Sequence, residues 1–505
     1  MTNSLDVFDT ALLRNVYLPT DIFKVIEQEV SRNFYNKRVE AEKQAKEQYP
    51  YYNIYDIYRF LPEFDVNLEL ETELNNCKAN EKILKLYKEN PSNFVFISDM
   101  YLPSKEIRKM LEKVGYSNPQ VFVSCEMKAL KGSGELFKEV QDLLGHEIQK
   151  HYGDNYIADI EGAQKAGISE VEFIPALHKT ELPIPAVRDP KLKKFLAEAI
   201  CGNRSVEYKA AMFVAPLVLG FTKWVLKQRK EGQKIFFLSR DMQVPYMVAK
   251  DILKAPDIYY LYASRRSLSA ACLKAKDEKL REKVKAVLIS EAEVEEKGRE
   301  GVQETLKYLN KFNIKNGDII VDIGYAATVQ AAIESVLNVK LTGLYVQIHP
   351  EVLFDVEAIQ YLRRRVINLC LMIEVILGSC EDCVESYKNG EVVFTPENQE
   401  RKALAKRMTD ALLEGVKEIL PLNISIYDVE QALIHLQYYP TRDIIELFNK
   451  EIYSNRNTGE SIVNFNKNRI LKGELKSLYQ KSYAKKLFKQ LLEEDPELSQ
   501  LNTLI

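Results

Sequence analysis

The sequence predicts an α/β protein with more than one domain. Short, mainly apolar runs such as Phe94–Ile97 and Lys234–Leu238 are typical of buried parallel strands, and a polar residue follows each of them directly. Segments with the apolar spacing of helices separate several of these runs, as in an open parallel sheet. The chain has 505 residues, which is more than a single hydrophobic core usually supports.

Composition excludes some classes of partner. The formal net charge is −3, so there is no electrostatic basis for binding nucleic acid or an anionic membrane. The longest apolar run, Ala210–Phe221, is too short to span a bilayer and contains Pro216, so we expect no membrane insertion. Seven cysteines are scattered along the chain and no signal peptide opens it. We therefore expect a cytoplasmic protein with reduced thiols.

Four polar motifs follow one another in the first third of the chain. Asp6 comes after a short lead-in, and Ser98 comes directly after Phe94–Ile97. Lys131 stands beside small residues and ahead of an amphipathic stretch. Asp154 and Asp159 lie five residues apart just after a glycine, which suits a loop at the carboxyl end of a strand. There the two carboxylates could hold a hard divalent cation against the Asp of the first strand.

This ordered set resembles the haloacid dehalogenase-like (HAD) superfamily. The resemblance is carried by SLDVFDT (4–10), SDMYLP (98–103), KGSGELF (131–137) and GDNYIAD (153–159). In detail the chain is most similar to two-domain bacterial predicted hydrolases that accompany surface-polysaccharide synthesis. The resemblance is specific for roughly the first third of the chain. It implies a HAD-like, Rossmann-like parallel sheet with a helical cap insert, followed by a second α/β domain and a helical C-terminal region.

The resemblance also implies a chemistry. Asp6 would attack phosphorus and form an aspartyl-phosphate, Ser98 would bond a phosphoryl oxygen, and Lys131 would neutralise charge. Mg²⁺ would be the cofactor, held by Asp6, Asp154, Asp159 and the backbone carbonyl of Phe8. The alternative for each residue is an ordinary capping or surface role.

A helical insert interrupts the first domain between about residues 15 and 91. Asp21–Tyr49 places apolar residues at spacings of three and four, followed by the charged run Lys37–Glu47. An insert at this point resembles the superfamily cap, which closes over the active site and helps choose the substrate. The alternative is a helical side domain without a catalytic share.

One departure from the family pattern concerns the proton donor. Phosphatases of the superfamily carry a second Asp two residues after the nucleophile, but here that residue is Phe8, followed by Asp9. Since one step along a strand reverses side-chain direction, Asp9 should not simply replace it. The leaving group then needs no proton, or another segment supplies the acid, or the site binds without turnover. Dehalogenases of the superfamily also lack this acid, but they work without metal, so Asp154 and Asp159 favour phosphoryl chemistry.

The chain divides into three parts in this interpretation. Pro183, Pro185 and Pro190 mark the end of a first domain, 1–187, whose core also includes Gln120–Ser124 and Tyr156–Ile157. A second α/β domain, 188–397, has further strands at Ile258–Tyr262, Asp318–Val321 and Leu341–Val346. The region 398–505 is helical and polar, with helices expected at Ala403–Ile419, Val429–Leu436 and Leu475–Leu492.

Polar clusters follow three of the strands in the second domain. In open α/β sheets ligands bind outside the carboxyl ends of strands, so these clusters could form one anion-binding pocket. Its candidate residues are Arg240, Asp241, Arg265, Arg266, Asp322, Thr328 and Glu374. Helix caps and ion pairs would explain the same residues equally well.

The sequence therefore favours a cytoplasmic, Mg²⁺-dependent HAD-type phosphohydrolase. Its partner would be a phosphorylated small molecule, and the resemblance alone suggests a sugar phosphate or a polysaccharide precursor. Two alternatives stay open. One is a HAD domain that has lost turnover and serves as a binding or scaffold module. The other is a transferase whose main reaction lies in the second α/β domain.

Overall fold

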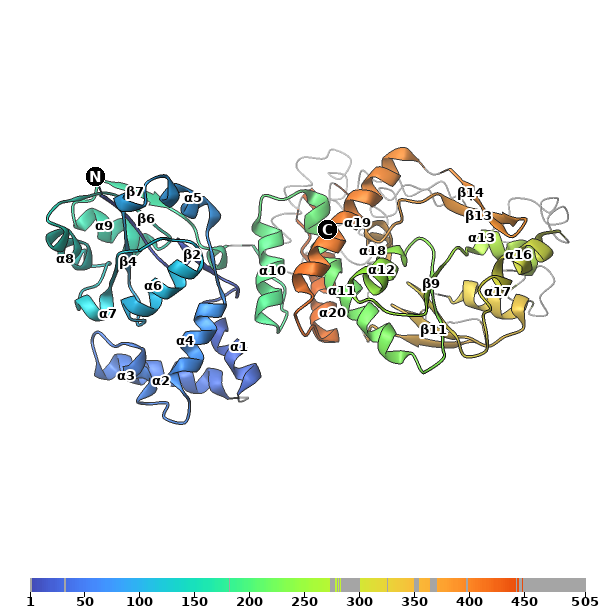
Figure 1. The fold of residues 1–505 in the computed structure, drawn as a ribbon, viewed down its shortest axis with the longest axis horizontal. Helices are drawn as coiled ribbons and strands as arrows, with labels where there is room; N and C mark the ends of the chain where they lie inside the picture. Colours follow the sequence, from blue (N-terminus) through green and yellow to red (C-terminus); the bar gives the residue numbers. More distant parts are fainter. Residues whose placement is uncertain are drawn as a thin grey trace, which may run out of the picture. The chain divides into compact units, whose positions relative to one another are not determined.

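The computed structural model describes residues 2–447 apart from 31–32, 181, 273–277, 279, 281, 283–299, 325, 349–353, 364–369, 397, 442 and 445–446. The chain forms two compact units, Met1–Leu182 and Pro183–Ile505 (Figure 1). Each unit contains a five-stranded parallel sheet, so the α/β class is confirmed. The finer division into 1–187, 188–397 and 398–505 stays a prediction, and the expected helix Leu475–Leu492 lies outside the described residues.

The sheet of the first unit has the order β5-β4-β1-β6-β7. Its strands are β1 (Thr2–Leu5), β4 (Phe94–Ser98), β5 (Val121–Val123), β6 (Ile148–Gly153) and β7 (Glu170–Phe173). In chain order this is a 3-2-1-4-5 arrangement, in which the direction of winding reverses between β1 and β6. At such a switch point the loops after the two strands diverge and leave a crevice at the carboxyl edge.

Strand β4 shows why this sheet forms. Phe94 and Phe96 belong to the apolar core on one face, together with the cap, whereas Val95 and Ile97 belong to the core on the other face. Successive side chains of a strand point to opposite faces, so a strand covered on both sides must be apolar throughout. Helix α6 (Ser104–Lys113) covers the first face and α8 (Glu135–Leu144) the second, each through its buried apolar stripe.

The remaining elements of the core are short. Two of them bend the chain near the site, the π-helix η2 (Tyr156–Glu161) and the 3₁₀ helix η3 (Leu177–Lys179). The others are α5 (Glu81–Glu89), the 3₁₀ helix η1 (Pro91–Asn93), α7 (Ser124–Met127) and α9 (Gly162–Lys165).

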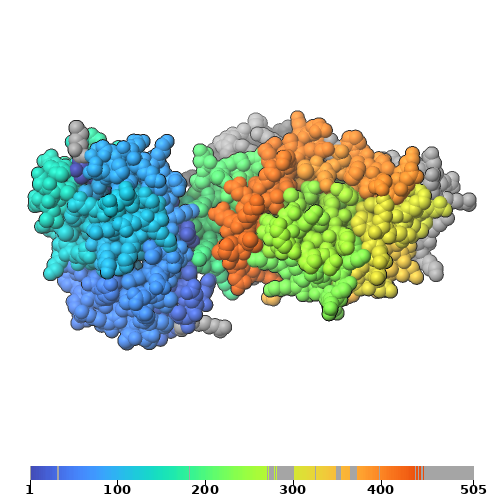
Figure 2. Space-filling model, viewed as in Figure 1, coloured from blue at the N-terminus to red at the C-terminus, as the bar shows by residue number. Residues whose placement is uncertain are grey.

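A helical cap is inserted into a β-hairpin of the first unit. Strands β2 (Leu12–Arg14) and β3 (Cys77–Ala79) pair antiparallel, and the cap lies between them. It consists of α1 (Asp21–Glu29), α2 (Phe34–Gln48), α3 (Ile54–Tyr58) and α4 (Val66–Asn75), which form a layer beside the sheet in Figure 1. The cap and the α/β core present one continuous surface in Figure 2.

A buried ion pair holds the cap helices together. Arg38 of α2 is fully buried and donates to both carboxylate oxygens of Glu69 in α4, at 2.6 and 2.8 Å. The hydroxyls of Tyr58 and Tyr101 donate to the same carboxylate at 3.1 Å each. Every oxygen of this buried acid is therefore hydrogen-bonded, which is the condition for keeping a charge inside a protein.

The sheet of the second unit has the order β12-β11-β10-β8-β9. Its strands are β8 (Ile235–Leu238), β9 (Ile258–Leu261), β10 (Ile319–Asp322), β11 (Thr342–Tyr345) and β12 (Glu357–Gln360). In chain order this is a 2-1-3-4-5 arrangement with its switch point between β8 and β10. A hairpin of β13 (Cys383–Lys388) and β14 (Glu391–Thr395) follows.

Helix α11 (Val206–Gln228) is a core element of the second unit and packs against α19 (Gln399–Ile419) and α20 (Ile426–Tyr438). By length and composition α11 could cross a membrane, but 72% of its most apolar 18-residue window is buried inside the protein. A core helix of a globular unit has the same character. Further helices are α10 (Pro190–Cys201), α12 (Gln243–Met247), the π-helix η4 (Val248–Ile252), α13 (Arg265–Cys272), α16 (Glu300–Asn310), α17 (Thr328–Leu337) and α18 (Cys370–Ile376).

Some expected strands were wrong or missed. Tyr156 and Ile157, expected in a strand, lie in η2 and are exposed. The strand that supports the Asp154 loop is instead the polar segment Ile148–Gly153. His151 and Tyr152 are buried in this strand. Because the segment is polar, it lacks the apolar run that predicts a buried strand.

Candidate active site

Asp6 directly follows β1, the central strand of the first sheet. Its backbone N–H donates to the carbonyl of Tyr152 in β6 at 2.8 Å, which continues the pairing of the two strands by one residue. The expected short lead-in is confirmed, because β1 covers only Thr2–Leu5. Asp6 is 6% exposed and lies at the switch point of the sheet. The fold therefore fixes this carboxylate where a ligand is expected to bind.

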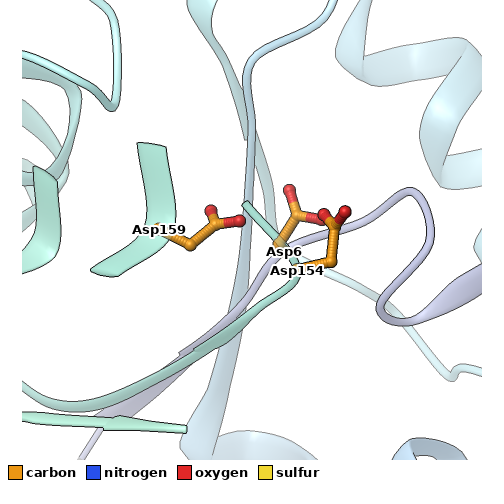
Figure 3. A group of neighbouring side chains, drawn as sticks. All are labelled: Asp6, Asp154 and Asp159. Carbon is orange, nitrogen blue, oxygen red and sulfur yellow. The ribbon is translucent and has the colours of Figure 1, made fainter. Parts of the chain in front are cut away.

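Asp154 lies beside Asp6, and Asp159 points toward both of them from across the site (Figure 3). Asp154 follows β6, and Asp159 lies in the first turn of η2. One oxygen from each of the three carboxylates lies within 4.8 Å of the others, and all three residues are buried. A Cβ on Gly153 would lie 2.3 Å from the Asp159 Cγ, so the glycine makes room for this acid. The sequence-predicted acids thus form one cluster.

Lys131 connects two of these acids. Its Nζ donates to Asp6 Oδ1 at 2.6 Å and to Asp159 Oδ1 at 2.5 Å, and the residue is 2% exposed. Its backbone N–H donates to the Asp99 carboxylate, which fixes the loop. A Cβ on Gly162 would lie 2.0 Å from the Lys131 carbonyl oxygen, so helix α9 can approach this loop only with glycine there. Lys131 is therefore held from both sides.

The two acids that share Lys131 titrate in opposite directions. Burial raises the pKa of Asp6 to about 8, against the attraction of Lys131, and the charges of Asp159 and Asp154 add to the rise. Burial also acts on Asp159, but the charge of Lys131 and the hydrogen bond from His151 outweigh it and hold the pKa of Asp159 well below its ordinary range. Burial alone would lower the pKa of Lys131, yet Asp6 and Asp159 raise it. The ammonium is thus shared unequally, in favour of Asp159.

His151 is a supporting residue to which the sequence analysis gave no role. It lies in β6, is fully buried, and its Nε2 is 3.2 Å from Asp159 Oδ1 while its Nδ1 is 2.8 Å from Ser4 Oγ. Because an ionised carboxylate only accepts, Nε2 carries the proton and Nδ1 accepts from the hydroxyl of Ser4. Burial lowers the pKa of His151, so the ring is neutral at pH 7. The ring orients Asp159 from behind.

Lys179 is a second cation at the cluster that the sequence analysis missed. It lies in η3, and its Nζ donates to Asp154 Oδ2 at 2.7 Å and to the Asp154 carbonyl at 2.9 Å. Burial raises the pKa of Asp154, and Lys179 opposes that rise. No local motif marks this residue, because its contact depends on how the chain returns to the site after β7.

A cavity of ≈ 370 Å³ opens over the cluster. The sequence-predicted residues Asp6, Phe8, Ser98, Lys131, Asp154 and Asp159 all line it. Ser98 is the last residue of β4 and is 2% exposed. The cavity falls within the range for a small-molecule ligand. Its outer wall comes from the cap and the segments beside it, including Arg14, Thr20, Phe23, Glu42 and Tyr101.

The position of Asp9 differs from the sequence-based expectation. Alternation would turn the Asp9 side chain away from the site only if the strand continued through Asp9, but β1 ends at Leu5 and Asp9 has a left-handed backbone with φ 62°. Asp9 therefore lines the same cavity as Asp6. Its Oδ2 lies 3.8 Å from His178 Nδ1 and 3.9 Å from a guanidinium nitrogen of Arg14. Burial lowers the pKa of His178, so its ring is neutral at pH 7.

The chemistry of the cluster fits a hard cation. Three carboxylate groups at short mutual distances are the donor set that Mg²⁺ and similar ions prefer, and Mg²⁺ usually completes its coordination with water and substrate phosphate. Lys131 and Lys179 partly neutralise these acids in the absence of metal. The role of the Phe8 carbonyl as a ligand, and the roles assigned to the individual residues, stay predictions.

The candidate residues of the second unit lie in a separate place. Arg240 and Asp241 follow β8, Arg265 begins α13 after β9, and Asp322 ends β10. Asp322 interacts electrostatically with Asp241, Arg265 and Glu374. Arg266 instead reaches Glu385 of β13 at 3.5 Å. Thr328 is buried as the first residue of α17.

The fold and the site define an α/β protein with a buried acidic cluster, suited to a hard cation, at the carboxyl edge of its first sheet. No protein-family model matches the chain, and no curated protein matches it. Among solved structures it is similar to two structures of L-2-haloacid dehalogenase from Xanthobacter autotrophicus, one of them with chloropropionic acid covalently bound. In each case the identity is 12%, the match covers 41% of this chain and 85% of the other, and the TM-score is 0.24. A likeness at this level carries no argument about function.

Proposed function

We propose that the first unit is a Mg²⁺-dependent phosphohydrolase of the HAD type. The observation that carries this proposal is the convergence of three buried carboxylates within 4.8 Å at the switch point, two of them bonded to Lys131. Phosphoryl transfer asks mainly for a positioned nucleophile and for neutralisation of phosphate charge. The cluster offers a nucleophile in Asp6, ligands for a cation, and a fixed ammonium group.

Each residue then has a defined task. Asp6 attacks phosphorus while the leaving oxygen departs, and water later hydrolyses the aspartyl-phosphate. Ser98 donates to a phosphoryl oxygen, and Lys131 keeps the Asp6 carboxylate oriented and offsets the charge of the phosphate. Bound Mg²⁺ would neutralise charge on the phosphoryl oxygens and favour the ionised form of Asp6. His151 would hold Asp159 in position from behind.

The substrate in this proposal is a phosphorylated small molecule in the cytoplasm, with a sugar phosphate or polysaccharide precursor as the leading class. The cavity supports this size class, and its cap wall includes Glu42 and Tyr101. Glu42 accepts hydrogen bonds from Tyr52 and Arg38 and still lines the cavity. Hydroxyl groups of a polyol are suited to a wall of this kind.

Asp9 is the proposed proton donor to the leaving oxygen. It lines the cavity beside Asp6 although Phe8 occupies the usual acid position. The neighbouring His178 lies 3.8 Å away and could relay the proton. In this scheme, alkyl phosphates, whose alkoxide must be protonated as it departs, react nearly as fast as aryl phosphates.

A second candidate function is binding without turnover. Phe8 favours it, because a phenylalanine at the usual acid position cannot donate a proton, and its ring instead packs against the guanidinium of Arg14, whose carbon lies 4.1 Å from the ring centroid. Loss of a general acid typically lowers a rate by about 10²–10⁴-fold. A module of this kind would still bind Mg²⁺ and phosphate.

Initial rates over a series of aryl and alkyl phosphates, with and without Mg²⁺, test these proposals. We expect Mg²⁺-dependent turnover that Asp6→Asn abolishes and Asp9→Asn makes steeply dependent on the leaving group. Asp65→Asn is the matched control, because Asp65 caps α4 and does not line the cavity. Turnover by Asp6→Asn would refute the proposed nucleophile. Mg²⁺ binding without turnover of any ester would favour the binding module.

A further inference from the structure

The second sheet also has a switch point. Its strand order reverses between β8 and β10, which are parallel neighbours with Phe237 opposite Val321. The segments that follow these strands, beginning at Ser239 and Ile323, therefore leave the same edge of the sheet in opposite directions. In open α/β sheets this is the place where ligands bind. The first unit already places a cluster of functional groups at its own switch point, between β1 and β6.

Charged side chains of both signs gather at this edge. Asp241, just after β8, interacts electrostatically with Arg240, Arg401 and Arg265. Asp322, at the end of β10, interacts with Asp241 and Arg265, and with Glu374 from α18. Asp241, Asp322 and Arg240 are only half-buried, so the cluster is open to a ligand. The groups come from strand ends and helices far apart in the sequence, which the fold brings to one place.

The loops at this edge are held in unusual conformations. Arg240 has a left-handed backbone with φ 73°, and its N–H donates to Tyr260 Oη at 2.9 Å. Tyr260 and Tyr262 both donate to the carboxylate of Glu381, at 3.1 and 2.9 Å. Non-glycine residues in this region cost free energy, and such strain is concentrated at functional sites. The aromatic pair and Glu381 keep the β8 loop in this form.

Helix α17 begins at the same edge. Its N-cap, Ala327, has φ 54° and offers no side chain that could bond the N–H groups of the first turn. Just before it, Gly324 has φ 138°, and a Cβ there would lie 2.0 Å from the carbonyl oxygen of Gln347. The loop can therefore pass this close to the segment that follows β11 only with glycine. The N–H groups of a helix start that no side chain caps favour an anion.

We propose that this edge binds a small phosphorylated ligand that also carries hydroxyl groups. Arg265, Arg401 and the start of α17 would hold the phosphate, and Asp241 would accept from the hydroxyls. A cation is the weaker alternative. Among the described residues, the acids that lie close enough together to hold a metal are Asp6, Asp154 and Asp159, and none of them belongs to this edge.

The electrostatics of the edge agree with an anionic ligand. Burial raises the pKa of Asp322 to about 8, and the charge of Asp241 adds to the rise. Burial also raises the pKa of Asp241, against the attraction of its arginines. Asp322 therefore carries less negative charge at neutral pH than an exposed Asp would. The inference does not rest on the function proposed for the first unit, because no residue is shared.

Hydrogen exchange in the full-length chain can test the assignment. The experiment uses the Asp6→Asn variant with EDTA, so that the first unit does not hydrolyse the probe. The probes are inorganic phosphate and a hexose 1-phosphate. We expect the hexose phosphate to slow exchange in peptides around Asp241 and Asp322. We expect Arg265→Ala and Arg401→Ala each to weaken this binding by about 10-fold or more.

Matched control variants distinguish a specific binding site from general attraction of the probe by positive charge. Arg407 lies in α19 with Arg401 but pairs with Glu207 at 2.8 Å, so Arg407→Ala should bind the probe normally. Circular dichroism and exchange rates of the sheet peptides verify that each variant is folded. Absence of protection at millimolar hexose phosphate would overturn the proposal, as would equal weakening in Arg401→Ala and Arg407→Ala. Equal affinity for inorganic phosphate and the hexose phosphate would show an adventitious ion only and overturn the ligand class.

Discussion

Replacing each of the two acids that share Lys131 should change stability in opposite directions. In the metal-free protein we expect Asp6→Asn to stabilise the first unit and Asp159→Asn to destabilise it. The reason is that burial raises the pKa of Asp6, whereas Lys131 and His151 hold the pKa of Asp159 below its ordinary range. The two substitutions are chemically identical, so they serve as controls for one another.

The magnitude for Asp6 follows from its pKa. This pKa is about 8 in the folded protein, against 3.8 for an unperturbed Asp. A raised pKa means that the protonated acid stabilises the fold at low pH and that this contribution is lost as the pH rises through 8. At pH 7 the raised pKa lowers the free energy of unfolding by ~1.4 kcal/mol for each of the ~3 pH units above the ordinary pKa, or by ~4 kcal/mol at most. An uncharged Asn does not carry this penalty, so we expect Asp6→Asn to raise the free energy of unfolding by ~2–4 kcal/mol.

The magnitude for Asp159 has the opposite sign. This residue is fully buried and accepts from Lys131 at 2.5 Å, from the Asn155 N–H at 2.8 Å and from His151 at 3.2 Å. Asparagine cannot satisfy all of these donors, and it leaves Lys131 with the weaker partner, Asp6. Breaking a buried ion pair from one side costs ~3–5 kcal/mol.

Urea unfolding at pH 7 with EDTA measures both effects. Repeating it at pH 5 should shrink the gain from Asp6→Asn to at most ~1.6 kcal/mol, because pH 5 is only ~1 pH unit above the ordinary pKa of an Asp in the unfolded chain. Loss of stability in both variants, or a gain that grows toward low pH, would refute the assignment of unequal sharing. Added Mg²⁺ should stabilise the wild type more than either variant.

Three further changes probe the site and the cap. Gly153→Ala should abolish activity by displacing Asp159, since the new Cβ would lie 2.3 Å from the Asp159 Cγ; steady-state kinetics measure this. Glu69→Gln should destabilise the first unit by ~3–5 kcal/mol, because it removes the buried carboxylate that pairs with the guanidinium of Arg38 and leaves only the partly exposed Glu42 as its charge partner; denaturant unfolding measures this. Mg²⁺ binding should release protons below pH 8, because the ion displaces the proton held by Asp6; calorimetry in buffers of different ionisation enthalpy measures this.

Each of these has a control. Gly132→Ala should be tolerated, since the nearest atom to its Cβ would be 3.9 Å away. Glu63→Gln removes the partner of an exposed lysine in the cap and should change stability little. An Asp6→Asn variant should release no protons on adding Mg²⁺. Normal activity of Gly153→Ala, a large effect of Glu63→Gln, or proton release by Asp6→Asn would each contradict the corresponding prediction.

The sequence predicted those parts of the fold that apolar patterns encode. Strand β4 was found because both of its faces are covered, so Phe94–Ile97 reads as an unbroken apolar run. Strand β6 was missed because it contains polar residues: His151 contacts Asp159, and Lys150 pairs with Glu172 of the edge strand β7. Tyr156 and Ile157 led to the opposite error, a predicted strand that does not exist, because these large apolar side chains are 61% and 64% exposed.

The acidic cluster could be predicted because its residues follow strands in a fixed order. The role of Asp9 could not be assigned. Its place in the cavity depends on its own left-handed backbone and on a first strand that is only four residues long. Lys179 and the cap wall depend on contacts between segments far apart in the chain. Patterns within a short window hold no information about such contacts.

In the topology of the first unit, the whole cap is the loop of one β-hairpin, formed by β2 and β3. Arg14 of β2 pairs with Cys77 of β3, and the N–H of Asn15 donates to the carbonyl of Asn76 at 2.7 Å, so the two ends of residues 15–76 are adjacent. A tight Asn-Gly turn could in principle connect the same two strands. In the phosphohydrolase that we propose, the carboxylates and the cap wall that would select the substrate thus belong to separable pieces of chain. We expect exchange of this one loop to let the same carboxylates serve a different range of molecules, which would offer engineers a single point at which to graft a new specificity.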